Sequence, residues 1–195
     1  MKETINYYNH NAAAFIENTI AVDMGEIQAR FLSAIPKTAN ILDLGCGSGR
    51  DSKVFADLGY SVTAIDGSLE LCQKASSYTG LSVRCLLFEE LDYCKEFDAI
   101  WACASLLHVE KDKMQQVLTL VADALKNDGV LYVSYKYGTE QQVRNGRLFS
   151  DYTEADIPTL FPANGQLECF DWWVTGDART DRSDEKWLNI LCRKK

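Results

Sequence analysis

Strand-like apolar runs alternate with helical patterns along most of this chain, and that alternation restricts its fold more than any other feature. Patterns of ten to seventeen residues with helical spacing, such as 68–79 and 110–126, lie between several of the runs. A connection that contains a helix joins parallel strands through a right-handed crossover, so the pattern predicts a parallel α/β sheet. The strands expected in that sheet cover residues 40–44, 61–65, 82–87, 97–102 and 130–135.

Two further amphipathic helices are expected before the first strand, at residues 5–18 and 24–35. Asp23 is placed to cap the second of them, because its side chain can accept from the free amides of the first turn. We expect residues 1–36 to form a helical lid on a single domain that spans residues 1–195.

The last two expected strands, at residues 166–174 and 186–192, are connected differently from the others. They follow a short helix at 153–161, in which Thr153 and Asp156 approximate a capping box. The polar stretch between the two strands is too short for a crossover helix, so they should run antiparallel. The predicted fold is therefore a doubly wound, mostly parallel seven-stranded sheet that ends in an antiparallel hairpin, a Rossmann-like architecture.

Composition and charge narrow the class of protein. The 195 residues are 47% hydrophobic and 25% charged, as is typical of a globular chain. The net charge of −8 disfavours a nucleic-acid partner, because binding a phosphate backbone needs basic side chains. No apolar run approaches the roughly 18 residues of a membrane-spanning helix, and the N-terminus lacks the apolar core of a signal peptide. We therefore expect a cytoplasmic protein with no membrane partner, and the sequence leaves the oligomeric state open.

The seven cysteines predict neither a disulfide framework nor a metal site. Their number is odd, no two are closer than nine residues, and no Cys-x-x-Cys motif occurs. The chain has only two histidines, so the ligand spacing of a zinc site is missing. We expect reduced thiols that serve as small apolar residues, and no bound metal.

The segment most informative about function is a glycine loop at residues 45–49 (Gly-Cys-Gly-Ser-Gly), between the first strand and a helix. Glycine is needed where the backbone turns tightly and where a ligand must approach without meeting a Cβ atom. A strand-to-helix turn also uses glycine for structural reasons alone. Here an acid, Asp66, closes the next strand about 20 residues further on, and that spacing favours a ligand with ribose hydroxyls.

The loop favours an adenosine joined to an amino acid over a dinucleotide. The dinucleotide fingerprint is Gly-x-Gly-x-x-Gly, and its third glycine is replaced by Arg50 when counted from Gly45 and by Ser52 when counted from Gly47. Asp43, two residues before the first glycine, would repel a diphosphate. Its carboxylate would suit the cationic amino group of an amino-acid moiety.

These residues resemble the S-adenosylmethionine-binding pattern of class I methyltransferases, in which Asp-x-Gly-x-Gly-x-Gly is followed by an acid at the end of the second strand. The pattern runs here from Asp43 to Gly49, and the acid is Asp66. The seven-strand order with a terminal hairpin is also that family's architecture, so the likeness covers nearly the whole chain. Within the superfamily, residues 45–52 followed by 59–66 are similar to the small tellurite-resistance-type methyltransferases.

The resemblance implies that Gly45, Gly47 and Gly49 lie under the methionine and ribose portions of S-adenosylmethionine. It places Asp43 near the amino group and Asp66 on the ribose hydroxyls. Family members often have an acid beside the adenine after the third strand; here that position is Leu87 or Phe88, so stacking by Phe88 and polar contact from Glu89 or the backbone are expected instead. The other cofactor contacts expected are Cys46, Arg50, Gly67, Ser68, Ala102, Cys103 and, from the N-terminal helix, Tyr8.

His108 follows the fourth strand, at the carboxyl edge where α/β proteins bind ligands. An imidazole at that edge can accept a proton from an acceptor hydroxyl or amine, which makes His108 the candidate catalytic residue. A buried histidine that is hydrogen-bonded to the backbone is the alternative interpretation.

The acceptor is expected to be a small molecule with a negative or electron-rich oxygen. Five cations follow strands at the same edge of the predicted sheet, and together they would attract an anion. Substrates of the tellurite-type subgroup include metalloid oxyanions, which points the same way. The alternative is that Glu140, Asp177, Asp181 and Asp184 neutralise these cations in surface pairs. The candidate substrate-binding cations are Lys136, Arg144, Arg147, Arg179 and Arg182.

The sequence thus predicts S-adenosylmethionine-dependent methyl transfer, in which positioning of the reactants contributes most of the rate. Two rival functions remain open. A nicotinamide-dependent oxidoreductase is disfavoured by the missing third glycine, and a cofactor-binding regulator without catalysis is not separable by sequence.

Overall fold

A seven-stranded sheet forms the centre of the protein in a computed structural model that describes residues 2–179, 182 and 184–195. The strand order is β3-β2-β1-β4-β5-β9-β8, and the first five of these pair in parallel. The last two are antiparallel to β5 and to each other, as predicted. The strands are β1 (Asn40–Leu44), β2 (Ser61–Asp66), β3 (Arg84–Cys85), β4 (Phe97–Ala102), β5 (Leu125–Lys136), β8 (Leu167–Gly176) and β9 (Lys186–Lys194).

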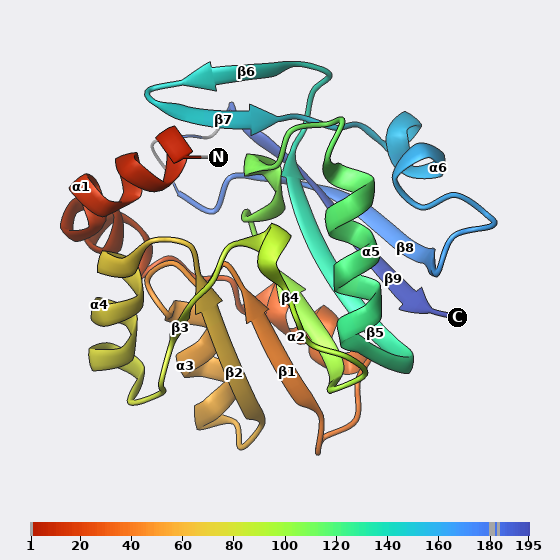
Figure 1. Cartoon of the computed structure of the whole chain (residues 1–195), viewed down its shortest axis with the longest axis horizontal. Coiled ribbons are helices and arrows are strands. Elements are labelled where there is room, and N and C mark those ends of the chain that lie inside the picture. The colour runs from red at the N-terminus through yellow and green to blue at the C-terminus, as the bar shows by residue number, and fades with distance from the viewer. Residues whose placement is uncertain (1, 180–181, 183) are drawn as a thin grey trace.

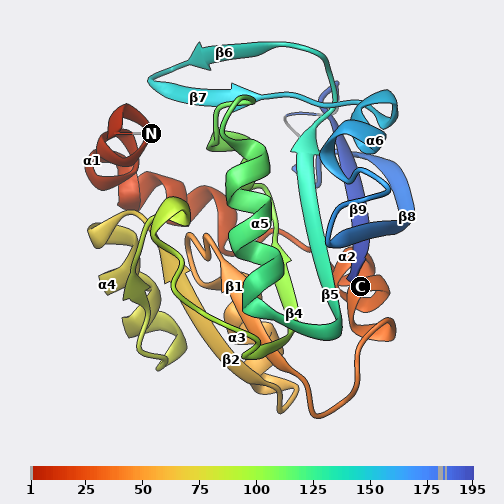
Figure 2. The same cartoon turned by 45° about the vertical axis from the view of Figure 1, so that its right-hand side comes forward.

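Helices cover both faces of this sheet, with α5 in front of the strands and α2 and α3 behind them (Figures 1 and 2). Side chains alternate between the two faces along β1: Ile41 packs into the cluster behind the sheet, and Leu42 into the cluster in front. The cluster behind is rich in aromatic rings, among which Trp101 stacks on Tyr132 with 4.1 Å between the ring centroids. The helices are α2 (Gly25–Ser33), α3 (Arg50–Asp57), α4 (Leu69–Thr79), α5 (Met114–Ala124) and α6 (Ile157–Leu160), with 3-10 turns η1 (Phe88–Glu90), η2 (Leu106–His108) and η3 (Glu154–Asp156).

The carboxyl edge of the parallel strands is covered by two elements from distant parts of the chain. Helix α1 (Lys2–Thr19) and the hairpin β6 (Gln141–Arg144) and β7 (Arg147–Ser150) lie above this edge in Figure 1. They are joined where the backbone amide of Leu148 donates to Thr4 Oγ1 at 3.1 Å. Helix α2, by contrast, buries Phe31 in the core behind the sheet.

The β6–β7 hairpin was not predicted from the sequence, although its turn carries a strong signal. Asn145 and Gly146 form a two-residue loop between the paired residues Arg144 and Arg147, and both loop residues have positive φ, +51° and +76°. Asn-Gly is the dipeptide that favours such a turn, because the twist of the turn matches that of the strands.

Other differences from the predicted elements are at their ends. Helix α5 ends at Ala124, before the predicted boundary, and β5 begins at once with Leu125. The third strand has two paired residues rather than six. The capping box at Thr153 and Asp156 is present and starts a 3-10 turn that continues into the single turn of α6.

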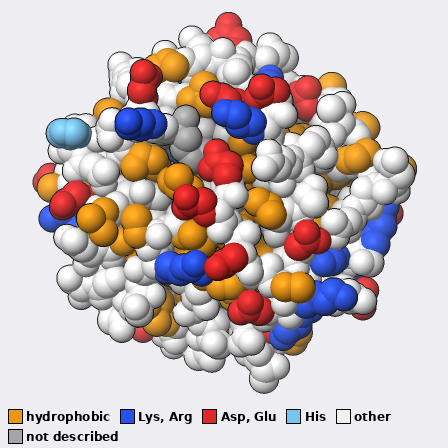
Figure 3. Space-filling view, in the orientation of Figure 1, with side chains coloured by type: hydrophobic (Ala, Val, Ile, Leu, Met, Phe, Trp, Pro, Cys, Tyr) orange, Lys and Arg blue, Asp and Glu red, His pale blue; other side chains and the backbone are white. Residues whose placement is uncertain are grey.

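Charged side chains of both signs are interspersed with hydrophobic ones on the face shown in Figure 3, and no extended basic surface appears there. None of the helices within the described ranges is both long and apolar enough to cross a membrane.

Phe31 is expected to be a major contributor to stability. It is fully buried and lies 5.0 Å from the Trp101 ring, 5.8 Å from Phe55 and 6.3 Å from Tyr132, centroid to centroid. Phe31→Ala should lower the free energy of unfolding by about 3–5 kcal/mol, because the cavity left among rigid rings cannot close. Urea denaturation measures this loss. Phe170→Ala is the control, since that ring is 45% exposed and its removal should change stability little; equal losses in the two variants would contradict this assignment of the core.

Candidate active site

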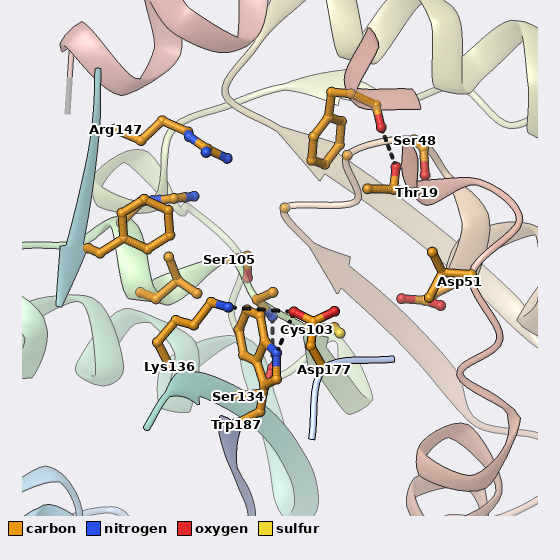
Figure 4. A pocket seen from close by; sticks show the side chains of 18 of the residues that line it. Thr19, Ser48, Asp51, Cys103, Ser105, Ser134, Lys136, Arg147, Asp177 and Trp187 are labelled. Atoms are coloured by element: carbon orange, nitrogen blue, oxygen red, sulfur yellow. Dashed lines mark hydrogen bonds and ion pairs between the residues drawn. The ribbon is translucent and has the colours of Figure 1, made fainter. Parts of the chain in front are cut away.

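A cavity of about 620 Å³ opens at the carboxyl edge of the sheet, between the glycine loop, α1 and β7. Figure 4 shows Arg147 and Lys136 on one side of it and Thr19, Ser48 and Asp51 on the other. Its volume is within the range of small-molecule and cofactor sites, about 300–1,000 Å³.

The glycine loop forms part of the cavity wall, and its conformation requires glycine. Gly45 and Gly47 have positive φ, +81° and +56°. A Cβ atom on Gly45 would lie 2.5 Å from the Cβ of Ser105, so the loop and the segment after β4 touch closely. The amides of Gly45 and Cys46 both donate to the carbonyl of Ile65 at 2.9 Å, which fixes the loop against the end of β2.

Asp66 links three segments of the site through its carboxylate. Oδ2 accepts from the amide of Gly47 at 2.9 Å, and Oδ1 accepts from the amide of Ser68 at 2.8 Å. Burial raises the pKa of Asp66, while these amide bonds favour its ionised form. The side chain lines the cavity, where the remaining lone pairs of both oxygens can accept further hydrogen bonds.

Asp43 lies on β1 just below the loop and is almost completely buried. Its Oδ2 accepts from the hydroxyl of Ser52 at 2.5 Å. Burial, together with the negative charge of Asp51, raises the pKa of Asp43 to about 7. A cation placed beside this carboxylate would stabilise its ionised form.

Asp51 proves to be a second structural centre of the site, a role that the sequence analysis did not predict. Its Oδ1 accepts from Gln28 Nε2 at 2.7 Å and from Arg50 Nε at 2.8 Å. Its Oδ2 accepts from Trp101 Nε1 at 2.9 Å and from Arg50 Nη2 at 2.8 Å. This carboxylate thereby ties α2 and β4 to the first turn of α3, directly after the glycine loop.

Most of the cofactor-contact residues expected from the sequence line the cavity, and four do not. Gly49 is the N-cap of α3, and a Cβ atom there would lie 2.7 Å from Thr79 of α4, so its role is packing. Ser68 caps α4 by accepting from the Leu71 amide at 3.3 Å. Glu89 and Ala102 also lie outside the lining. The expected residues that do line it are Tyr8, Asp43, Gly45, Cys46, Gly47, Arg50, Asp66, Gly67, Phe88 and Cys103.

His108 and Tyr8 form a hydrogen-bonded pair in the cavity wall. The imidazole Nδ1 lies 2.6 Å from the carbonyl of Leu148, which can only accept, so Nδ1 carries the proton. Nε2 lies 2.8 Å from Tyr8 Oη and therefore accepts from the hydroxyl. Burial lowers the pKa of His108 to about 4 and raises that of Tyr8. The alternative interpretation of His108, a buried histidine bonded to the backbone, is what the structure shows. The side chain also lines the cavity, and its catalytic role stays a prediction.

The five candidate substrate-binding cations all line the cavity, but the structure pairs four of them with carboxylates. Arg179 bonds to Asp177 at 2.7 and 2.8 Å, and Lys136 contacts Asp177 and Glu185. Arg182 lies 3.9 Å from Glu185, and Arg144 pairs with Asp151 and lies 3.8 Å from Glu140. Of the five cations expected to attract an anion, Arg147 is therefore the one that stays a candidate. Of the acids expected to neutralise the rim, Asp181 is outside the described residues.

Comparison with known proteins agrees with this geometry. Residues 41–129 match a family model described as a methyltransferase domain. A putative methyltransferase of Bacillus subtilis, YqeM, is 29% identical over 131 residues, which are 64% of this chain and 51% of the relative. A ubiquinone biosynthesis O-methyltransferase of Rickettsia felis is 30% identical over 123 residues, 60% of this chain and 50% of the relative. The chain thus spans about half the length of these curated relatives.

A solved structure with the same fold covers nearly the whole chain. It is the 1,6-didemethyltoxoflavin-N1-methyltransferase of Burkholderia thailandensis with bound 1,6-didemethyltoxoflavin and S-adenosylhomocysteine. The TM-score is 0.79 at 23% identity, over 97% of this chain and 84% of that one. The predicted Rossmann-like fold is confirmed. The match of residues 41–129 to a methyltransferase-domain model agrees with the predicted class of enzyme and its cofactor. The finer likeness to the tellurite-resistance type stays a prediction.

His108 is expected to be neutral at pH 7, since burial lowers its pKa to about 4. A proton-detected NMR titration checks this, with His10→Gln used to assign the two histidine signals. The folded state should bind fewer protons than the unfolded chain between about pH 4 and pH 6.5, so stability should fall as the pH drops through that window. A His108 signal that titrates near its ordinary pKa of about 6.5 would contradict the buried, hydrogen-bonded geometry.

Proposed function

We propose that the protein transfers the methyl group of S-adenosylmethionine to a small-molecule acceptor bound in the cavity. The observation that carries the proposal is the Asp66 carboxylate, held by the amides of Gly47 and Ser68 so that it faces the cavity beside the glycine loop. This arrangement supports the proposal, because the carboxylate lies at the end of β2, where the class I pattern has the acid that accepts from the two ribose hydroxyls.

The residues present fit S-adenosylmethionine. Gly45 and Gly47 present bare backbone to the cavity, and Asp43 offers a carboxylate to an amino group. Ser105 Oγ is buried and has no hydrogen-bond partner within the described residues, yet it lines the cavity, so a ligand atom can satisfy it. Phe88 supplies an apolar ring for a flat base. When bound, the cofactor supplies an electrophilic methyl carbon for an in-line displacement.

The protein's own contribution is to position the acceptor and exclude water. Phe15 and Tyr8 from α1 and Phe149 from β7 close the cavity over the carboxyl edge. Tyr8 Oη, oriented by its bond to His108, keeps lone pairs that can accept a hydrogen bond from an acceptor hydroxyl or amine. Holding two reactants in register contributes about 7–11 kcal/mol to a reaction of this kind. Within the residues 1–36 expected as the lid of a single domain, α1 serves as the covering part, whereas α2 packs behind the sheet.

Calorimetry and label transfer test the proposal against its rivals. S-adenosylmethionine and S-adenosylhomocysteine should bind, and NADH should not; the reverse would make the protein an oxidoreductase. Transfer of label from methyl-labelled cofactor to a panel of small acceptors, including thiols, amines, phenols and oxyanions, then separates an enzyme from a regulator. Binding without transfer to any acceptor would favour the regulator.

Asp66→Asn should weaken S-adenosylhomocysteine binding by about tenfold or more while the protein stays folded. The amide side chain keeps one acceptor oxygen but loses the charge, and a charge-assisted hydrogen bond contributes about 1.5–3 kcal/mol. Titration calorimetry measures the affinity. Asp57→Asn is the matched control, because that carboxylate is exposed and pairs with Lys53 on the same helix. Unchanged affinity in a folded Asp66→Asn protein would remove Asp66 from the cofactor site.

Cofactor affinity should also depend on pH through Asp43. Its pKa of about 7 means that the carboxylate becomes protonated as the pH falls below neutrality, and the attraction for an ammonium group is then lost. Affinity for S-adenosylhomocysteine should therefore fall between about pH 7.5 and pH 5.5, approaching tenfold per pH unit. In Asp43→Asn the dependence should disappear. A pH-independent affinity in the unmodified protein would show that Asp43 does not face the amino group.

A further inference from the structure

Arg147 is unlike the other cations of the cavity. Among residues 2–179, 182 and 184–195 no carboxylate forms an ion pair with it, and its Nε is buried without a hydrogen-bond partner. Aromatic rings surround it instead: its Cζ lies 4.6 Å from the centroid of Tyr7, 5.2 Å from Phe149 and 5.8 Å from Tyr8. Figure 4 shows the side chain pointing into the cavity.

This environment leaves Nε, and with it one edge of the guanidinium, available to a ligand, while the Tyr8 hydroxyl accepts a hydrogen bond from the same side chain. Aromatic rings attract the flat face of a guanidinium, whereas its N–H donors lie in the plane and point outward along the edge. A partly buried donor without a partner is costly, so a bound anion would relieve a cost that the free protein carries. A planar carboxylate matches the two parallel donors best.

The backbone on the C-terminal side of Arg147 is held on both of its polar groups. The amide of Leu148 donates to Thr4 Oγ1 at 3.1 Å, and its carbonyl accepts from His108 Nδ1 at 2.6 Å. On the other side is the tight Asn145-Gly146 turn. Arg147 therefore starts from a fixed position on the hairpin, and little ordering is needed when an anion binds.

The side chains that surround the Arg147 guanidinium are aromatic. Ile5, Leu107 and Phe149 line the same cavity, and the nearby His108 is neutral at pH 7 because its pKa is about 4. A small inorganic oxyanion needs several donors around it to replace its water. The Arg147 guanidinium is instead surrounded by aromatic rings, and the neighbouring Arg144 is already paired with Asp151. A molecule with an apolar body and a single anionic group matches both features.

We propose that the acceptor is a small aromatic or similarly flat apolar acid, whose carboxylate is bound by Arg147 and whose body packs against Phe149 and Tyr8. The proposal rests on the proposed function, because it names the substrate class of the same cavity. It narrows the anionic or electron-rich acceptor expected from the sequence, for which metalloid oxyanions were one possibility, to an organic acid. Arg147 is thus the specificity-determining residue, and Lys136, Arg144, Arg179 and Arg182 have their charges compensated within the protein.

Titration calorimetry with simple probes tests this. Benzoate, its neutral analogue benzamide and inorganic selenite are titrated into the full chain, with and without saturating S-adenosylhomocysteine. Benzoate should bind at least tenfold more tightly than either benzamide or selenite. Arg147→Gln should weaken benzoate binding about tenfold to a hundredfold and leave benzamide binding unchanged. Arg147→Lys, which keeps the charge without the planar fork, should be intermediate and provides a second variant if Arg147→Gln is unstable.

Arg84→Gln is the matched control, since that guanidinium is exposed and pairs with Asp92 outside the cavity. The inference is overturned if benzamide or selenite binds as tightly as benzoate, if no benzoate binding is detected, or if Arg147→Gln keeps full benzoate affinity. A separate S-adenosylhomocysteine titration distinguishes failure of the proposed acceptor class from failure of the proposed methyltransferase function. Cofactor binding without Arg147-dependent benzoate binding refutes the acceptor class alone, whereas benzoate binding without cofactor binding refutes the methyltransferase proposal and leaves the anion site standing.

Discussion

The hydrogen bonds that the amides of Gly47 and Ser68 donate to the Asp66 carboxylate are the interaction on which the site depends. They join the end of β2, the glycine loop after β1 and the first turn of α4. Burying a carboxylate is unfavourable, and the raised pKa of Asp66 reflects that cost. Two amide donors offset this cost. The same hydrogen bonds hold the loop in the conformation in which Gly45 and Gly47 have positive φ and line the cavity.

A second buried carboxylate, Asp51, supports this arrangement from below. Its four hydrogen bonds reach α2, β4 and the neighbouring Arg50, so the start of α3 cannot shift without breaking contacts in the core behind the sheet. The proximity of its charge to Asp43 helps to hold the pKa of Asp43 near 7, well above the ordinary value. Asp51 and Asp43 are therefore coupled. The carboxylate that anchors the start of α3 also raises the pKa of the carboxylate that we propose meets the cofactor's amino group.

The parallel strands, the glycine loop and the antiparallel ends of the sheet were predictable because each depends on local periodicity or on glycine at a tight turn. The hairpin at Asn145-Gly146 was equally readable and was missed, and with it the strand that carries Arg147 into the cavity. The pairing of charges was not readable. Asp177 follows β8, and Lys136, 41 residues away, ends β5. The two meet because β9 pairs with both strands, and no sequence spacing predicts such a contact. The same applies to the bond between Tyr8 and His108, which are 100 residues apart. The sequence thus predicts cations at the edge of the sheet, and only the fold shows which one of them meets no carboxylate within the described part of the chain.

The most direct test of the central claim is a crystal structure of the protein with S-adenosylhomocysteine bound. We expect the ribose hydroxyls within hydrogen-bond distance of Asp66 and the amino group beside Asp43. The sulfur should face the part of the cavity lined by Tyr8, His108 and Arg147. A ligand bound elsewhere, or one whose ribose lies away from Asp66 with the glycine loop untouched, would show that the loop is a structural turn and would contradict the account.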